Sequence, residues 1–217
     1  MRLLLPMLLV SLLGACSTPT LQEQPSAEFA DLPQPLYPVD YSGFEQAHVA
    51  RDAKFANYRR ISNAPLSLGA VEITQTTVSG TVRRDWMITP ERERNLGRAW
   101  KGSMQRAFAD YKWVSSQQTG QTEEGVLRIA ASLTRVRPRR SVATSTAASG
   151  SPIQGTGDTV DISMEIRLYD GEEGALLGVI RDTRTIASIQ WSRAAGADMV
   201  GLFNSWSSLL HTRISGH

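Results

Sequence analysis

Residues 160–168 (VDISMEIRL) alternate apolar and polar side chains without a break. A period of two predicts a β-strand with one buried and one wet face. Residues 170–174 (DGEEG) supply turn chemistry, and the stretch from Leu176 to Thr185 is predicted to return as the antiparallel partner. This hairpin is the strongest structural signal in the chain, and the other elements are placed around it.

A second alternating stretch, Leu127 to Thr134, predicts another half-buried strand. Shorter β-branched or aromatic runs at 71–78 and 111–115 predict two more. A weaker capping-box pattern at residues 42–45 favours a short helix towards Asn57.

Two amphipathic helices are predicted. Thr89 can cap the first and Pro90 suits its first turn. Apolar residues then recur at helical spacing in both helices: Leu96, Trp100, Met104, Phe108 and Tyr111 in the first, and Met199, Phe203, Trp206, Leu210 and Ile214 in the second. At this spacing we interpret the stripes as core faces rather than ligand grooves. The expected fold is α+β, a two-layer sandwich with an antiparallel sheet of about four or five strands and two helices on one face.

Composition excludes several classes of protein. The chain has 217 residues, 41% hydrophobic and 20% charged, which suits a globular domain rather than a collagen-like, disordered or multi-span membrane protein. A single cysteine excludes an intramolecular disulfide framework, and with three histidines it argues against structural zinc.

The N-terminus predicts a signal peptide over residues 1–15. The apolar run from Leu3 to Leu13 is too short to span a bilayer, which needs about 20 residues. Leu13-Gly14-Ala15-Cys16 resembles a bacterial lipobox, in which the thiol of the cysteine accepts diacylglycerol. An ordinary signal peptide with an incidental cysteine is the alternative. Because Ser17 rather than Asp follows Cys16, resemblance to Gram-negative sorting patterns favours the periplasmic face of the outer membrane.

Residues 16–41 are expected to be the lipidated cysteine and an extended tether. This stretch carries Pro19, Pro25, Pro33, Pro35 and Pro38, and proline removes backbone donors. About twenty extended residues reach on the order of 65–70 Å. Residues 42–217 are then one periplasmic domain, interrupted by a flexible loop at 139–157 that is rich in Ser, Thr, Ala and Gly.

Catalytic motifs are absent, since the chain has no HExxH, CxxC, GxSxG, SxxK or phosphate-binding loop. We therefore expect no enzyme, no metal site and no cofactor other than the acyl lipid on Cys16; a hydrolase with an unrecognised site is a remote alternative. One charge cluster stands out: Arg135, Arg137, Arg139 and Arg140. Guanidinium groups can grip phosphate or carboxylate through two hydrogen bonds, so this cluster is a candidate anion-binding site; the alternative is a solvated strand end.

Several short motifs resemble a family of bacterial lipoproteins. They are Ser42-Gly43-Phe44, residues 127–134 (LRIAASLT), Glu165 followed by Tyr169-Asp170 and Gly174, Arg181-Asp182, and Phe203 with Trp206. Together they resemble the domain-of-unknown-function 3313 family, from about Tyr41 onwards. The resemblance implies an envelope lipoprotein without a known reaction.

The function expected from the sequence is that of a non-enzymatic, lipid-anchored envelope protein with a binding or accessory role. Its partners would be the membrane, through the N-terminal lipid, and another envelope protein. The alternative is binding of anionic cell-wall or lipopolysaccharide groups by the arginine cluster. Nucleic acid is not expected as a partner after export.

Overall fold

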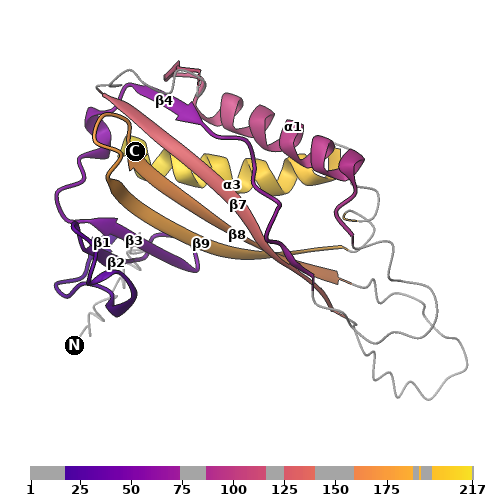
Figure 1. The fold of residues 1–217 in the computed structure, drawn as a ribbon, viewed down its shortest axis with the longest axis horizontal. Helices are drawn as coiled ribbons and strands as arrows, with labels where there is room; N and C mark the ends of the chain where they lie inside the picture. The colour runs from indigo at the N-terminus through magenta and orange to yellow at the C-terminus, as the bar shows by residue number, and fades with distance from the viewer. Residues whose placement is uncertain are drawn as a thin grey trace, which may run out of the picture.

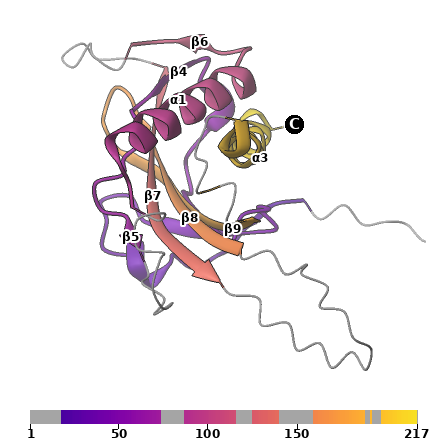
Figure 2. The ribbon, with the colours of Figure 1, turned by 90° about the vertical axis from the view of Figure 1, so that its right-hand side faces the viewer.

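A computed structural model of the chain describes residues 18–73, 87–115, 125–139, 159–187, 191 and 197–216. Their main feature is one mixed sheet with two long helices on one of its faces (Figures 1 and 2). The helices are α1 (Pro90–Ala107) and α3 (Ala197–Ser215). The strands are β1 (Thr20–Leu21), β2 (Leu36–Asp40), β3 (Gln46–Ala50), β4 (Arg60–Asn63), β5 (Glu72–Ile73), β6 (Lys112–Trp113), β7 (Val126–Arg139), β8 (Thr159–Asp170) and β9 (Leu176–Ala187). The α+β class is confirmed.

The predicted hairpin forms the centre of the sheet. β8 pairs antiparallel with β9 on one side and with β7 on the other, with Ile166 opposite both Ile180 and Ala131. The strand order is β1-β2-β3-β9-β8-β7-β4-β6, with β5 also paired to β7.

The sheet has nine strands, so the expected four or five was too few. It is also mixed rather than antiparallel, because β4 runs parallel to both β6 and β7, and β5 runs parallel to β7. Most of the additional strands are two to five residues long. Such short strands show too few alternations to be recognised by period alone.

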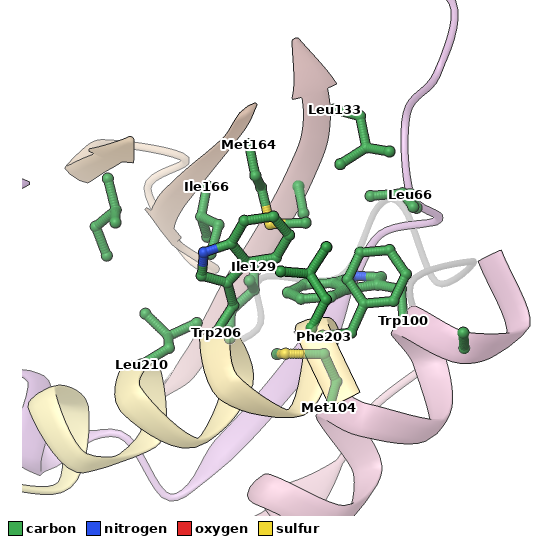
Figure 3. Close-up of a cluster of buried hydrophobic side chains, with 14 of the residues drawn as sticks. Leu66, Trp100, Met104, Ile129, Leu133, Met164, Ile166, Phe203, Trp206 and Leu210 are labelled. Carbon is green, nitrogen blue, oxygen red and sulfur yellow. The ribbon is translucent and has the colours of Figure 1, made fainter. Parts of the chain in front are cut away.

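Both predicted helices are confirmed, and their apolar stripes face the sheet. The Thr89 hydroxyl accepts the Arg92 backbone N–H at 3.2 Å and caps α1. Between the helices and the sheet, Trp100 and Trp206 are fully buried among aliphatic side chains of β7 and β8 (Figure 3). Full burial of each large apolar side chain contributes about 1.5–3 kcal/mol, so this layer is the main source of stability.

The expected helix from residue 42 to Asn57 is not formed. The chain instead makes β3 and a short 3-10 helix, η2 (Phe55–Asn57). Gly43 has φ +83°, outside the right-handed helical region, and the Ser42 hydroxyl accepts the Phe44 N–H at 3.3 Å. This local bond competes with a helical start, so the chain enters β3 directly.

Residues 20–40 were expected to belong to an extended tether and instead fold against the sheet. They contain β1, a 3-10 helix η1 (Ala27–Phe29) and β2, which pairs with β3. Phe29 and Leu36 are buried with Ala50 and Val179 in a second, smaller apolar cluster. Burial of these two side chains offsets the entropy of ordering a proline-rich segment, which is itself already restricted.

Two other expectations fall partly or wholly outside the described residues. Of the strand expected at 71–78, β5 accounts for Glu72–Ile73, and residues 74–78 lie outside. The loop expected at 139–157 lies outside from residue 140, while Arg139 closes β7. Within the described part of the chain, neither helix is long and apolar enough to cross a membrane.

Candidate functional site

The helix-free face of the sheet is a polar surface. Along β8, the residues that alternate with the core side chains are Asp161, Ser163, Glu165, Arg167 and Tyr169. Across the ladder with β9, Ser163 faces Thr183 and Asp161 faces Thr185. The Ser163 and Thr183 hydroxyls lie 3.0 Å apart, and the Thr185 hydroxyl donates to the Asp161 carboxylate at 2.7 Å. This face is therefore built from ordered rows of hydrogen-bonding and charged groups.

A β-bulge brings the predicted arginines onto this face. In the first half of β7 the odd-numbered residues, such as Leu133, point to the core. The register shifts between Leu133 and Arg135, with Thr134 as the extra residue, and Val136 then takes the core side opposite Ile162. Arg135, Arg137 and Arg139 consequently lie on the polar face, opposite Ser163, Asp161 and Thr159.

Two of these three arginines are paired with carboxylates. Arg135 Nε lies 3.0 Å from Glu72 Oε2, and Arg139 Nε contacts Asp161 Oδ2. Arg137 is exposed and makes no ion pair or hydrogen bond with the residues that the structure describes. The fourth predicted member, Arg140, lies outside them. The structure thus brings Arg135, Arg137 and Arg139 together, and among the described residues it pairs Arg135 and Arg139 with carboxylates but not Arg137.

A second charge network crosses the same face at the β9 side. Arg181 is held by both oxygens of Glu28, at 2.6 and 2.7 Å, and donates to Glu165 at 2.8 Å. Arg167 donates to the other oxygen of Glu165 at 2.7 Å. Glu28 belongs to η1, so this chain of ion pairs fastens residues 20–40 to the sheet.

The charges in this network are mutually stabilised. Burial alone would raise the pKa of the Glu165 carboxyl, but the hydrogen bonds from Arg181 and Arg167 outweigh it and hold that pKa below its ordinary value. The hydrogen bond from Arg181 lowers the pKa of Glu28, and the two carboxylates raise the pKa of Arg181 in return. All four groups are fully ionised at neutral pH, so they form a fixed salt-bridge network rather than acid–base machinery.

His48 lies beneath the folded N-terminal segment. Its ring meets Phe29 edge-on with centroids 5.1 Å apart, and its buried Nδ1 has no hydrogen-bond partner among the described residues. Burial lowers the pKa of His48; the Glu28 carboxylate opposes this shift and the Arg181 cation adds to it. The neutral imidazole is therefore favoured, as expected for a packing role.

The described surface includes two open hollows, one on the polar face and one beside η2. One, of about 300 Å³, lies on the polar face between Arg135 and Arg181 and is floored by Ser163 and Thr183. The other, of about 410 Å³, lies beside Lys54, Tyr58 and Leu177. Both are open to solvent and polar or mixed in lining, unlike the enclosed apolar pockets that bind most small molecules.

Two further pairs of titratable side chains are His211 with Asp110 and Tyr58 with Asp170. His211 Nε2 lies 3.0 Å from Asp110 Oδ1 near the end of α3. The Tyr58 hydroxyl donates to Asp170 Oδ2 at 2.6 Å, and burial followed by this bond raises the pKa of Tyr58. Among the described residues, no three His, Cys, Asp or Glu side chains are grouped closely enough to hold a metal ion.

The other predicted site residues lie outside the described part of the chain: Leu13, Gly14, Ala15 and Cys16. Sequence reasoning missed the packing of His48 against Phe29 and the contribution of Glu28 to the ion pairs around Arg181. The one available signal was the presence of three aromatic residues, Phe29, Tyr37 and Tyr41, in a stretch otherwise typical of a tether.

Residues 34–210 match the model of the family described as protein of unknown function DUF3313. The chain belongs to this family. The match spans the sheet from just before β2 and most of α3, so the family fold includes the polar face. No curated protein matches the chain.

Three of the solved structures that are similar to this chain are the following. PelC from Paraburkholderia phytofirmans, titled a dodecamer, is 12% identical, with a TM-score of 0.40 over 75% of this chain and 96% of that one. Lipoprotein GNA1162 from Neisseria meningitidis is 12% identical, with a TM-score of 0.35 over 73% of this chain and 99% of that one. A minor lipoprotein from Acinetobacter baumannii is 12% identical, with a TM-score of 0.32 over 73% of this chain and 94% of that one. Similarities of this size do not identify a function.

Proposed function

We propose that this DUF3313 protein is a lipoprotein of the bacterial outer membrane, anchored on the periplasmic side by acyl chains on Cys16, with a non-enzymatic binding or accessory role. The observation that carries the proposal is Leu13-Gly14-Ala15-Cys16 at the end of a short apolar run. Each buried CH₂ contributes about 0.8 kcal/mol, so two or three acyl chains make an effectively permanent anchor. The polar, ion-paired sheet face suits surface recognition better than catalysis.

The anchor is tested by Cys16→Ser. Because Cys16 is the only cysteine, labelled palmitate should enter the parent chain and be absent from the variant. The variant should also leave the membrane fraction while its domain stays folded by circular dichroism. A variant that still fractionates quantitatively with membranes would contradict lipid anchoring.

The outer-membrane assignment is tested separately by Ser17→Asp. An aspartate after the lipidated cysteine resembles the pattern of inner-membrane retention, so the variant should move to the inner-membrane band of a density gradient. Ser17→Thr is the matched control and should stay with the outer membrane. An Asp variant that stays there as well would contradict the assignment but not the anchor.

A second role, binding of anionic groups by the arginine cluster, is favoured by the unpaired state of Arg137 within the described residues. Arg137 lies between two arginines whose charges Glu72 and Asp161 already neutralise. The guanidinium of Arg137 could take one carboxylate or phosphate through two hydrogen bonds.

Sedimentation with purified cell wall tests this second role. Arg137→Gln should weaken binding several-fold, and salt should weaken the parent protein's binding steeply, because exposed charge contacts are screened. Arg94→Gln, which removes the same charge from the exposed side of α1, is the matched control. Equal binding by the two variants would leave the cluster as a solvated strand end.

A further inference from the structure

Two exposed apolar side chains stand together at the corner formed by β1 and β2. Within the described residues the exposed large hydrophobic side chains are Leu21, Tyr41 and Met87, with 37%, 65% and 56% of their surface accessible. Leu21 pairs with Val39 and Thr20 with Asp40, and Tyr41 directly follows Asp40 where β2 ends, so both residues lie at this corner of the sheet. We call these two residues the Leu21–Tyr41 corner.

Tyr41 is held at this corner in an unfavourable backbone conformation. It has φ +56°, the only positive φ at a non-glycine residue in the described chain. A bulky residue rarely occupies this region, and such strain persists only where the surrounding structure enforces it. Here Arg213 of α3 enforces it, donating to the Ser42 carbonyl oxygen at 2.7 Å and to that of Tyr41 at 3.4 Å. The fold therefore presents a tyrosine to solvent at a position where glycine would be cheaper.

The corner is also next to the proposed anchor along the chain. Thr18 is two residues after Cys16, and Leu21 is five residues after it. At no more than about 3.6 Å per residue, Leu21 lies within about 18 Å of the acylated cysteine. The headgroup layer on each side of a bilayer is roughly 5–8 Å thick. An acylated Cys16 therefore keeps this corner within reach of the headgroup layer.

We propose that the Leu21–Tyr41 corner rests in the headgroup layer of the membrane that holds the acyl chains, and so fixes the orientation of the domain. The inference rests on the proposed lipidation of Cys16. A tyrosine suits this depth because its ring is apolar and its hydroxyl can stay hydrated. The contact need not be strong, because the anchor keeps its local concentration in the millimolar range.

Spin-label accessibility in vesicles tests the inference. The acylated chain carries no other cysteine, so Tyr41→Cys, Leu21→Cys, Met87→Cys and Arg137→Cys each give one labelling site. In vesicles of phosphatidylethanolamine and phosphatidylglycerol, labels at 41 and 21 should collide several-fold more with oxygen, relative to a water-soluble nickel complex, than labels at 87 and 137. Met87 is matched in exposure and lies just before α1, whose first turn is at the opposite end of the long axis from β1 (Figure 1).

The outcomes separate the two proposals. Leu21→Cys keeps Tyr41 in place, so it reports on the corner even where the Tyr41 variant relaxes the turn. Labels at 21 and 41 that are as aqueous as those at 87 and 137, on protein that floats with the vesicles, would overturn the inference and leave the anchor intact. Protein that does not float would overturn the anchor, and with it the inference.

Discussion

Asp182 is a buried carboxylate that connects three elements. It is 7% exposed, yet it accepts hydrogen bonds from Trp206 of α3 at 2.7 Å, from Arg184 at 2.6 Å and from the Glu45 backbone at 2.9 Å. A buried charge is stable only when such partners replace water. Asp182 therefore fixes the edge of β9 to the helix layer and to the start of β3.

Replacing Asp182 with Asn should destabilise the fold by about 1–3 kcal/mol, because at least one donor loses its charged acceptor. Urea unfolding measures this change, and we expect a lower midpoint with an unchanged dependence of the unfolding free energy on urea concentration. Asp31→Asn, at an exposed site, should change stability by less than about 0.5 kcal/mol. Equal effects would mean that the Asp182 contacts contribute nothing.

His48 gives the fold a dependence on pH near neutrality. Since burial lowers the pKa of His48 from 6.5, the unfolded chain takes up a proton where the folded chain does not. Stability should therefore fall as pH drops from about 6.5 towards the folded pKa. Glu28 and Glu165, whose pKa values are lowered, lose their contribution only below about pH 4.5, outside this window.

The urea midpoint at pH 7.5 and 5.5 measures this dependence. The parent protein should lose more stability between the two pH values than His48→Phe, which cannot be protonated and keeps a ring against Phe29. A variant that loses as much as the parent would assign the dependence to other groups.

At the scale of elements, residues 20–40 are attached more weakly than the central strands. Their apolar cluster is small, and the Glu28–Arg181 pair is 51% and 32% exposed at its side chains. We expect Phe29→Ala, at a cost of about 3 kcal/mol, to speed amide exchange in β2 by about a hundredfold and leave β7 and β8 unchanged. Glu28→Gln should change the rate of amide exchange in β2 by less than about fivefold. Uniformly faster exchange in Phe29→Ala would instead show one cooperative unit.

The sequence predicted the elements that carry a long periodic pattern. β8 and β9 were expected within two residues of their bounds, and α1 begins at Pro90 as expected. β4 was missed because its position depends on a parallel partner, β7, more than sixty residues later. Pairing at such a separation leaves no local signal.

The candidate site was predictable in composition but not in geometry. Arg135, Arg137 and Arg139 share odd numbers with the core residue Leu133, so simple alternation would have placed them on the buried face. Only the bulge resolves this conflict. The partners Glu72 and Asp161 come from other strands, and no spacing in the sequence connects them to the arginines.

At the scale of the whole molecule, β1 and the last residues of β7 lie towards opposite ends of the long axis (Figure 1). At one end, β3 pairs with Gly178 of β9, which in turn pairs with Leu168 of β8. At the other end, Arg139 of β7 pairs with Thr159 of β8. These two levels are nine residues apart on β8, or about 30 Å. With the anchor at the β1 end, Arg137 would face away from its own membrane, which favours cell-wall carboxylates over that membrane's headgroups as its ligand.

Lengthening the link to the anchor tests this arrangement. Twenty Gly/Ser residues inserted after Ser17 span about 25 Å as a random coil. The insertion should free the Leu21–Tyr41 corner, so that a label at 41 becomes as aqueous as one at 137, while the protein still floats with vesicles. A label that stays immersed would mean that the corner binds lipid without help from the short link.

The bulge in β7 has a consequence for how this strand tolerates changes in length. Thr134 is the extra residue of the bulge. Without it, Leu133 and Val136 would still point to the core and Arg135 and Arg137 to the polar face, in an unbroken ladder. Loss of Ser132 instead would turn Leu133 outward and Thr134 inward. Deleting Thr134 therefore leaves every neighbouring side chain on its own face of the sheet, whereas deleting Ser132 does not. What Thr134 adds is the bend of the strand.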